Sequence, residues 1–357
     1  MYPRLNIDII KLNSNAHKLT EMCKEKGVSV MGVTKVVCAD KRIVDVMLQN
    51  GFKYFADSRL ENFMKYPKYN HLPKVLLRLP MISEAEKVVE ICDISLNSEI
   101  ATITRLGEAA AAAGKTHGIL LMIDLGDLRE GIYYTNEKKI IETAKLIKKQ
   151  KFLDFSGVGV NLTCYGSVLP SETNMQKLVE ISQVIEKKTG LKSKIISGGN
   201  SSSLSMAESG KLPKEINNLR IGEALIRGVE TAYGKPFHNL HQNIITLDAE
   251  IIEIYEKPSL PEGETGVNAF GEKITYVDKG KGKRAILALG RQDIVEEGIT
   301  PLIKGLEIIG VSSDHLIMDI NKAEVNLAVG DIVPFSLSYG AILAAFTSGY
   351  VKRNYIG

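Results

Sequence analysis

Short apolar segments alternate with helical segments over the first two-thirds of the chain, and this alternation restricts the fold more than any other feature. The apolar segments are rich in β-branched residues and are bounded by glycine or polar residues, which is typical of buried parallel strands. Strands are expected near residues 30, 54, 77, 94, 120, 158, 195 and 220. Helical patterns separate most of them, at 41–50, 83–92, 101–113, 137–150 and 172–188.

Eight β/α units within about 230 residues are what a TIM (β/α)8 barrel requires. A doubly wound sheet fits less well, because no expected strand is followed by a GxGxxG turn. We therefore predict an α/β chain whose first domain, residues 1–237, is a TIM barrel. The first few residues are assignable to either domain.

The pattern changes after about residue 233, where long helical stretches end and β-forming residues dominate. Gly, Pro and Asp turns separate these segments, as in antiparallel sheets. We predict that residues 238–357 form a smaller, mostly antiparallel β domain, with the boundary inside 234–243. Its expected strands are 244–255, 273–277, 284–289, 306–311, 315–320 and 331–335.

Charge and cysteine usage argue against several classes of function. The net charge is +3, from 45 basic and 42 acidic residues, and gives no support to nucleic-acid binding. No run approaches the ~18 apolar residues of a membrane helix. The four cysteines lie far apart with no CxxC, and the histidines show no ligand spacing. We expect no metal, no disulfide framework and a cytoplasmic location.

A lysine closely follows the first expected barrel strand, within residues 32–40 (GVTKVVCAD). Barrels of this kind carry their sites at the C-terminal ends of the strands. Lys35 is therefore a candidate Schiff-base lysine. An ordinary lysine at a strand end is the alternative, and this segment alone does not decide between them.

Two loops after the last expected strands have the composition of phosphate-binding turns. Residues 197–203 (SGGNSSS) combine glycines with hydroxyl donors, and residues 219–224 (LRIGEA) end a strand in glycine. The alternatives are a flexible turn and, for Arg220, a strand-end salt bridge. A lysine at the first strand and phosphate loops at the last strands together fit a phosphorylated aldehyde cofactor, pyridoxal 5'-phosphate.

At these segments the chain resembles the alanine racemase family of fold-type III, pyridoxal-phosphate-dependent enzymes, over essentially its whole length. Residues 6–19 (NIDIIKLNSNAHKL) are similar to that family's opening strand and helix. The resemblance implies that Lys35 forms the aldimine with the cofactor and moves the α-proton of the substrate. Residues 122–131 (MIDLGDLREG) are similar to the family's KVDTGMGRLG, which implies that Arg129 binds substrate.

The resemblance also implies a set of cofactor-binding residues. Arg220 would face the pyridine nitrogen, and the backbone amides of Gly222 and Glu223 would bind the phosphate. The remaining implied cofactor residues are Asn161, in place of a histidine beside the cofactor, the phosphate-binding pair Asn200 and Ser201, and Tyr339, which would reach the phosphate.

Several positions differ from the better-known bacterial alanine racemases. Arg291 takes the place of the catalytic tyrosine, Ser313 and Asp314 replace a Met-Asp pair near the substrate carboxylate, and Met122 replaces a carbamylated lysine. With TKVVCAD, FADSRLEN and ALGRQD, this pattern looks more like the ornithine racemase branch. We expect Arg291 and Asp314 to take part in catalysis, and Arg291 and Ser313 to contact substrate.

The resemblance implies an isomerase that interconverts L- and D-amino acids, with ornithine the expected substrate. An alanine racemase, or a broad-specificity racemase for lysine or serine, is the first alternative. A basic amino-acid decarboxylase is less consistent, because the chain lacks an EPGR segment. A non-enzymatic pyridoxal-phosphate homeostasis protein would lack the β domain. The resemblance further implies a head-to-tail homodimer with shared active sites.

Overall fold

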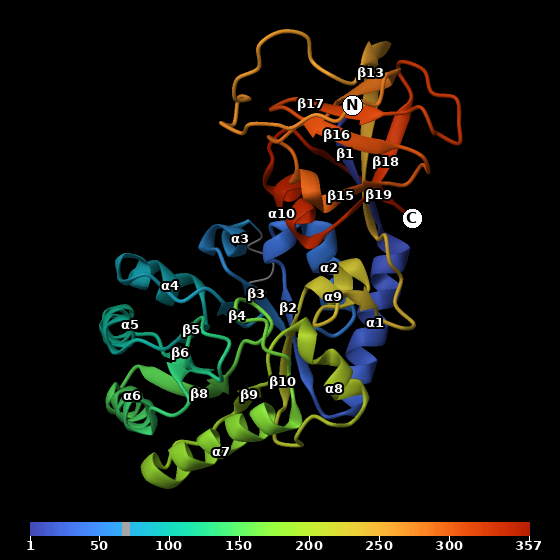
Figure 1. Ribbon diagram of the computed structural model, residues 1–357. Coiled ribbons are helices and arrows are strands. Elements are labelled where there is room, and N and C mark those ends of the chain that lie inside the picture. The colour runs from blue at the N-terminus through green and yellow to red at the C-terminus, as the bar shows by residue number, and fades with distance from the viewer. Residues whose placement is uncertain (66–71) are drawn as a thin grey trace. The chain divides into compact units, whose positions relative to one another are not determined.

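The computed structural model describes residues 1–65 and 72–357, which form two compact units (Figure 1). Lys11–Gln242 make up one unit, and Met1–Ile10 with Asn243–Gly357 make up the other. The chain enters the barrel unit after Ile10 and leaves it after Gln242, a few residues beyond the boundary expected after residue 237. Among the described residues, no helix has the length and apolar character needed to span a membrane.

Eight parallel strands close into a barrel in the larger unit, which confirms the predicted TIM-like fold. The order around the ring is β5-β4-β3-β2-β10-β9-β8-β6, and β5 also pairs with β6. The strands are β2 (Ser29–Val33), β3 (Tyr54–Asp57), β4 (Lys74–Leu76), β5 (Ile94–Asn97), β6 (His117–Asp124), β8 (Leu153–Gly159), β9 (Ile195–Ser197) and β10 (Asn218–Ile221). A short strand, β7 (Ile132–Tyr133), adds to β6.

Helices alternate with these strands and lie outside the barrel (Figure 1). The longest, α7, begins where the Ser171 hydroxyl accepts from Asn174 N and ends at Gly190 in the left-handed conformation. The helices are α1 (Ile9–Glu25), α2 (Lys41–Gln49), α3 (Leu60–Met64), α4 (Ala85–Ile91), α5 (Ile100–Ala113), α6 (Glu137–Lys149), α7 (Glu172–Thr189), α8 (Leu204–Glu208) and α9 (Glu223–Arg227).

Two apolar layers fill the larger unit because a barrel strand is covered on both faces. In β6, Leu120 and Met122 pack with the barrel-interior cluster, while Ile119 and Leu121 pack with the layer beneath the helices. Successive side chains of a strand point to opposite faces, so one strand serves both layers. This explains why the barrel strands read as continuous apolar runs.

The smaller unit is a mostly antiparallel sheet, as expected. Its central strand, β13, pairs with β1, β18 and β14, and β1 pairs in parallel with β19. The strands are β1 (Arg4–Asp8), β13 (Ile245–Pro258), β14 (Lys281–Ala288), β15 (Ile299–Pro301), β16 (Glu307–Val311), β17 (His315–Asp319), β18 (Ile332–Leu337) and β19 (Lys352–Ile356). A helix that the sequence pattern missed, α10 (Tyr339–Thr347), follows β18.

The strand expected over 273–277 is wrong. These residues lie within the connection between β13 and β14, and no strand is assigned there. The sequence KITYV favours a strand, but β13 and β14 already pair with each other, and β14 pairs on its other side with β17. All five residues are exposed, so no packing surface supports extended pairing.

A buried histidine lies at the start of β6. His117 is 1% exposed, and its Nδ1 lies 3.2 Å from the carbonyl oxygen of Cys92. That oxygen only accepts, so Nδ1 carries the proton and Nε2 accepts from the Ser95 hydroxyl at 2.7 Å. Burial lowers the pKa of His117 to about 4. The imidazole is therefore neutral in the folded protein at neutral pH.

This histidine makes stability depend on pH. In the unfolded chain His117 has a pKa of about 6.5, so below that pH it takes up a proton, whereas in the folded protein it stays neutral until about pH 4. We expect the free energy of unfolding to fall by roughly 3 kcal/mol as pH drops from about 6.5 to 4, and His117→Gln to flatten this part of the profile. Urea unfolding at several pH values measures it, with the exposed His238→Gln as control. If the free energy of unfolding falls equally steeply with pH in wild type and His117→Gln, the prediction is contradicted.

Candidate active site

Lys35 lies at the C-terminal end of the barrel, where the sequence predicts the site. It is exposed and begins a 3-10 turn, η1 (Lys35–Val37), one residue beyond β2. The carbonyl oxygen of Thr34 accepts from the amides of Val37 and Ala39, each at 3.1 Å. The hydroxyl of Thr34 donates to Asp57 Oδ2 at 2.5 Å. The turn that carries the lysine is thus tied to the end of β3.

Asp57 is a residue that the motif analysis did not single out. It is fully buried and also accepts from Asn62 Nδ2 at 2.9 Å and from the Arg59 amide at 3.0 Å. Burial raises the pKa of this carboxyl, while the hydrogen bonds from Thr34 and Asn62 act against the rise. The segment FADSRLEN contains both Asp57 and Asn62, but the sequence does not show that they face Thr34.

Arg220 lies at the barrel mouth on β10, which pairs with β2, and is 3% exposed. Its guanidinium donates to the Val160 carbonyl at 2.5 Å, to Asn161 Oδ1 at 2.6 Å and to the Ser197 hydroxyl. Gly159 lies directly beside it, since a Cβ there would be in van der Waals contact with Arg220 Nη1 at 3.5 Å. Burial lowers the pKa of Arg220 to about 10, against the charge of Glu130. The guanidinium therefore stays protonated at neutral pH.

A carboxylate links Arg129 and Arg220, the two barrel arginines that the sequence singles out. Glu130 accepts from Arg129 through both oxygens, and one of the same oxygens accepts from Asn161 Nδ2. Burial works to lower the pKa of Arg129, but the hydrogen bond and charge of Glu130 outweigh it and raise that pKa. Arg129, Asn161 and Arg220 thus form one polar cluster around Glu130, which the sequence analysis did not identify.

The two predicted phosphate loops meet at Ser201. Its hydroxyl accepts from the Ala224 amide at 3.2 Å, which joins the 3-10 turn η4 (Ser201–Ser203) to the start of α9. Asn200 precedes η4, accepts from the Ser202 amide at 2.9 Å and donates to the Leu162 carbonyl at 3.0 Å. Gly222 precedes α9.

Cys164 lies near both the Asn-Ser loop and Lys35. Asn200 Nδ2 donates to its sulfur at 3.3 Å. Partial burial raises the pKa of the Cys164 thiol, while the positive charges of Arg129 and Lys35 oppose the rise. The barrel therefore brings together the lysine, both arginines and the Asn-Ser loop. Glu223 lies at the edge of this group of residues, where it forms an ion pair with Arg227.

These residues have the chemistry that pyridoxal phosphate needs. An exposed primary amine, Lys35, can react with an aldehyde. Two helical turns begin side by side at Ser201 and Glu223, where amides and hydroxyls suit a phosphate. The Ser202 hydroxyl, buried in the same loop, has no hydrogen-bond partner in the described part of the chain. Arg220 offers a fixed cationic donor to a ring nitrogen.

The predicted residues of the β domain also cluster, within their own unit. Arg291 forms a fork with the Glu272 carboxylate at 3.2 and 3.3 Å, and its guanidinium carbon lies 3.9 Å from the centre of the Phe270 ring. The hydrogen bonds that Arg291 donates to Glu272 raise the pKa of Arg291. Arg291 is therefore a fixed cation and a poor base.

Two turns of the β domain, one around Gly290 and one around Ser313, are in close contact. A Cβ at Gly290 would collide with the Ser313 carbonyl. This contact places Asp314 beside Gln292, which donates to its Oδ1 at 2.6 Å, while the Ser313 hydroxyl donates to its Oδ2 at 2.8 Å.

Tyr339 belongs to the same region of the β domain. It begins α10, and the amide of the preceding Ser338 donates to the Gly298 carbonyl at 2.7 Å. Gly298 ends η5 (Glu296–Gly298), and Glu296 pairs with Arg291 at 3.5 Å. The predicted β-domain residues therefore lie on connected turns.

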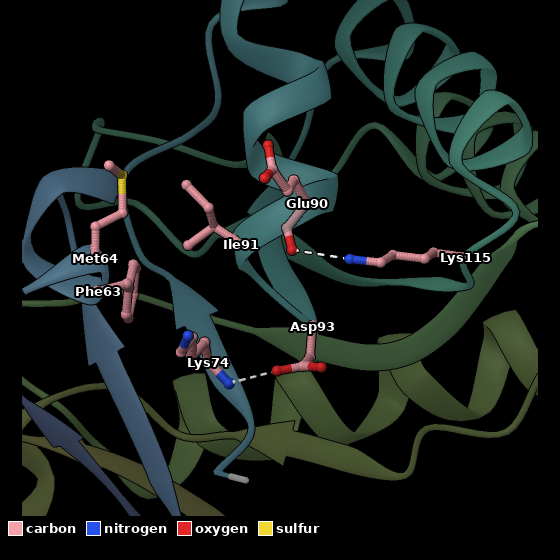
Figure 2. A pocket seen from close by; sticks show the side chains of 7 residues that line it. All are labelled: Phe63, Met64, Lys74, Glu90, Ile91, Asp93 and Lys115. Carbon is pink, nitrogen blue, oxygen red and sulfur yellow. Dashed lines mark hydrogen bonds between the residues drawn. The ribbon is translucent and has the colours of Figure 1, made fainter. Parts of the chain in front are cut away.

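A cavity of about 470 Å³ lies elsewhere and is not the site (Figure 2). Its lining includes Lys74, Asp93 and Lys115, which lie at or just before the starts of β4, β5 and β6. Figure 2 shows Lys74 bonded to Asp93 through its backbone amide and Lys115 bonded to the Glu90 carbonyl. This is the opposite end of the barrel from Lys35, so the cavity is separate from the site.

Comparisons with known proteins bear on the family and the fold of the chain. The family model for the N-terminal domain of alanine racemase matches residues 7–228. An ornithine racemase from Acetoanaerobium sticklandii is 44% identical, and a lysine racemase from Thermotoga maritima is 37% identical, each over 99% of both chains. The solved alanine racemase from Streptomyces coelicolor A3(2) aligns with a TM-score of 0.75 and 16% identity, covering 99% of this chain and 98% of that one.

The close packing of β10 against β2 generates a prediction at Gly222. A Cβ there would lie 2.6 Å from the Val33 carbonyl oxygen, next to the turn that carries Lys35. Gly222→Ala must push the two strand ends apart, and we expect it to lower the free energy of unfolding by about 1–3 kcal/mol. Urea unfolding measures this. The control is Gly349→Ala, where a Cβ meets open space; equal effects of the two changes would refute the prediction.

Proposed function

Because the chain belongs to the alanine racemase family, we propose that it is a pyridoxal-phosphate-dependent amino-acid racemase that interconverts L- and D-ornithine. The observation that carries this proposal is the 44% identity to an ornithine racemase across 99% of both chains. The similarity to a lysine racemase supports the same class of substrate, an amino acid with a basic side chain. Similarity to solved alanine racemases is below 20% identity and bears on the fold alone.

Lys35 is the proposed acid/base on the barrel side of the substrate. When bound, pyridoxal phosphate supplies an aldehyde for the substrate amine and a ring that delocalises the negative charge left by the α-proton. The Nζ atom of Lys35 takes that proton from one face or returns it. The hydrogen bond from Thr34 to Asp57 supports this role, because it fixes the backbone from which the lysine extends.

Arg220 favours racemisation over competing reactions. A guanidinium that remains protonated at neutral pH donates hydrogen bonds but does not give up a proton. A ring nitrogen facing Arg220 would stay unprotonated, and the ring would withdraw less charge. This arrangement also speaks against the decarboxylase alternative, because those barrel enzymes place an acidic residue at that nitrogen.

Inversion requires a second group on the opposite face of the substrate. We place Arg291, Ser313 and Asp314 of a partner subunit's β domain there, in a head-to-tail homodimer. Arg291, held by Glu272, suits the substrate carboxylate, and Asp314 is the acidic group that we assign to catalysis on this face. Tyr339 is assigned to the cofactor phosphate.

Turnover of three amino acids tests the function. With pyridoxal phosphate present, we expect kcat/KM to rank L-ornithine first, L-lysine second and L-alanine last, measured by chiral chromatography. Lys35→Ala should lower kcat by about 10²–10⁴-fold, because a positioned proton-transfer group is removed. The control is Lys41→Ala, a lysine in an exposed ion pair with Asp45 on α2. Alanine as the best substrate would refute the ornithine assignment, and carbon dioxide release would identify a decarboxylase.

Subunit complementation tests the shared site. Lys35→Ala and Arg291→Ala proteins should each be nearly inactive. After subunit exchange about half of the dimers are hybrids, and each hybrid holds one intact site of two. We therefore expect about a quarter of wild-type activity for a two-fold symmetric dimer. If mass spectrometry confirms exchange and no activity returns, the site is not shared through Arg291.

A further inference from the structure

We propose that Glu130 is a positioning residue that holds both arginines of the barrel mouth, Arg129 directly and Arg220 through Asn161. The inference rests on the proposed function for its chemical meaning, because the two arginines are the cationic groups offered to cofactor and substrate. It assigns a role to a side chain that the motif analysis passed over.

The contact with Arg129 is a two-pronged ion pair. Arg129 donates from Nε to one Glu130 oxygen and from Nη2 to the other, the latter at 2.5 Å. A fork of this kind fixes the plane of a guanidinium as well as its position. The Glu130 side chain is 15% exposed and the Arg129 side chain 38% exposed, so solvent screens the acid less than the base.

The contact with Asn161 transmits the same constraint to Arg220. An asparagine amide has one accepting end and one donating end. Its Oδ1 accepts from Arg220 Nη2 at 2.6 Å, so its Nδ2 must point the other way, and there it meets Glu130. The carboxylate therefore selects one of two amide orientations, the one in which Asn161 presents an acceptor to Arg220.

Charge supports the same conclusion. Arg129 and Arg220 are like charges in one cluster, and each destabilises the protonated form of the other unless an anion lies between them. Glu130 is the acid that contacts this cluster, and its charge favours the protonated form of both guanidiniums. Without it, Asn161 could rotate, and Arg220 would face an amide donor.

The test uses Glu130→Gln, which keeps the shape of the side chain but turns one oxygen into a donor. A glutamine has one accepting end, so it cannot accept from Arg129 Nε on one side and from Arg129 Nη2 and Asn161 on the other, as the two oxygens of Glu130 do. It also carries no charge to offset the two guanidiniums, so both arginines are held less firmly. We expect pyridoxal phosphate to bind the cofactor-free protein about ten-fold more weakly, and kcat for ornithine to fall about 10–100-fold with KM changed much less. Glu130→Asp, which keeps the charge, should recover part of both losses.

Coupling to Asn161 separates positioning from mere structural support. If Glu130 acts on Arg220 through Asn161, then adding Glu130→Gln to Asn161→Ala should weaken cofactor binding little beyond the larger single loss. The matched control is Glu180→Gln, which removes an exposed acid paired with Lys177 on α7 and should leave all readouts unchanged. Additive losses in cofactor affinity would overturn the link through Asn161.

The outcome also distinguishes this inference from the proposed function. Cofactor affinity, followed by absorbance without substrate, needs no turnover, so the Glu130 test stands even if ornithine is not the substrate. A Glu130→Gln protein that unfolds at lower urea concentration but keeps wild-type cofactor affinity and kcat would show a structural role alone and would overturn the proposal.

Discussion

The barrel mouth is organised around a positive charge that the fold keeps away from water. Arg220 comes from β10, yet its hydrogen bonds go to the end of β9 and to residues just beyond β8. A buried guanidinium without partners would cost several kcal/mol, so these strand ends must keep their relative positions for the protein to fold at all. Gly159, at the end of β8, lies in the same packed region, where a Cβ would come within 3.1 Å of Met122 Sδ and would touch Arg220 Nη1 at 3.5 Å. Fold and site are therefore coupled through this one group.

Much of the architecture could be predicted because strand and helix periodicity is a local property. All eight barrel strands lie where the apolar segments indicated. Prediction failed where the outcome depended on partners distant in sequence. Residues 273–277 favour a strand, but the neighbouring strands already pair with each other. Helix α10 follows β18 in a region where the pattern indicated only strands.

The candidate site shows the same division between local and distant information. Lys35 and Arg220 were identifiable because each stands beside a strand end in a recognisable segment. Glu130 was not, although it adjoins Arg129, because its role depends on facing Asn161, thirty-one positions later in the chain. Asp57 likewise acts on a hydroxyl twenty-three positions earlier. Side chains whose importance comes from a partner carry no signal in a single sequence.

The first strand of the chain completes a sheet whose other strands are made last. β1 pairs with β13 and with β19, so Arg4 lies opposite Lys352. During synthesis the barrel residues emerge long before β19, and domains generally fold as they emerge. β1 therefore remains unpaired until the whole barrel and β13 have been synthesised, and its second partner, β19, is made only at the end of the chain. The barrel is therefore an insertion within the β domain. A nascent chain released before β13 is made would hold a complete barrel and an unpaired β1.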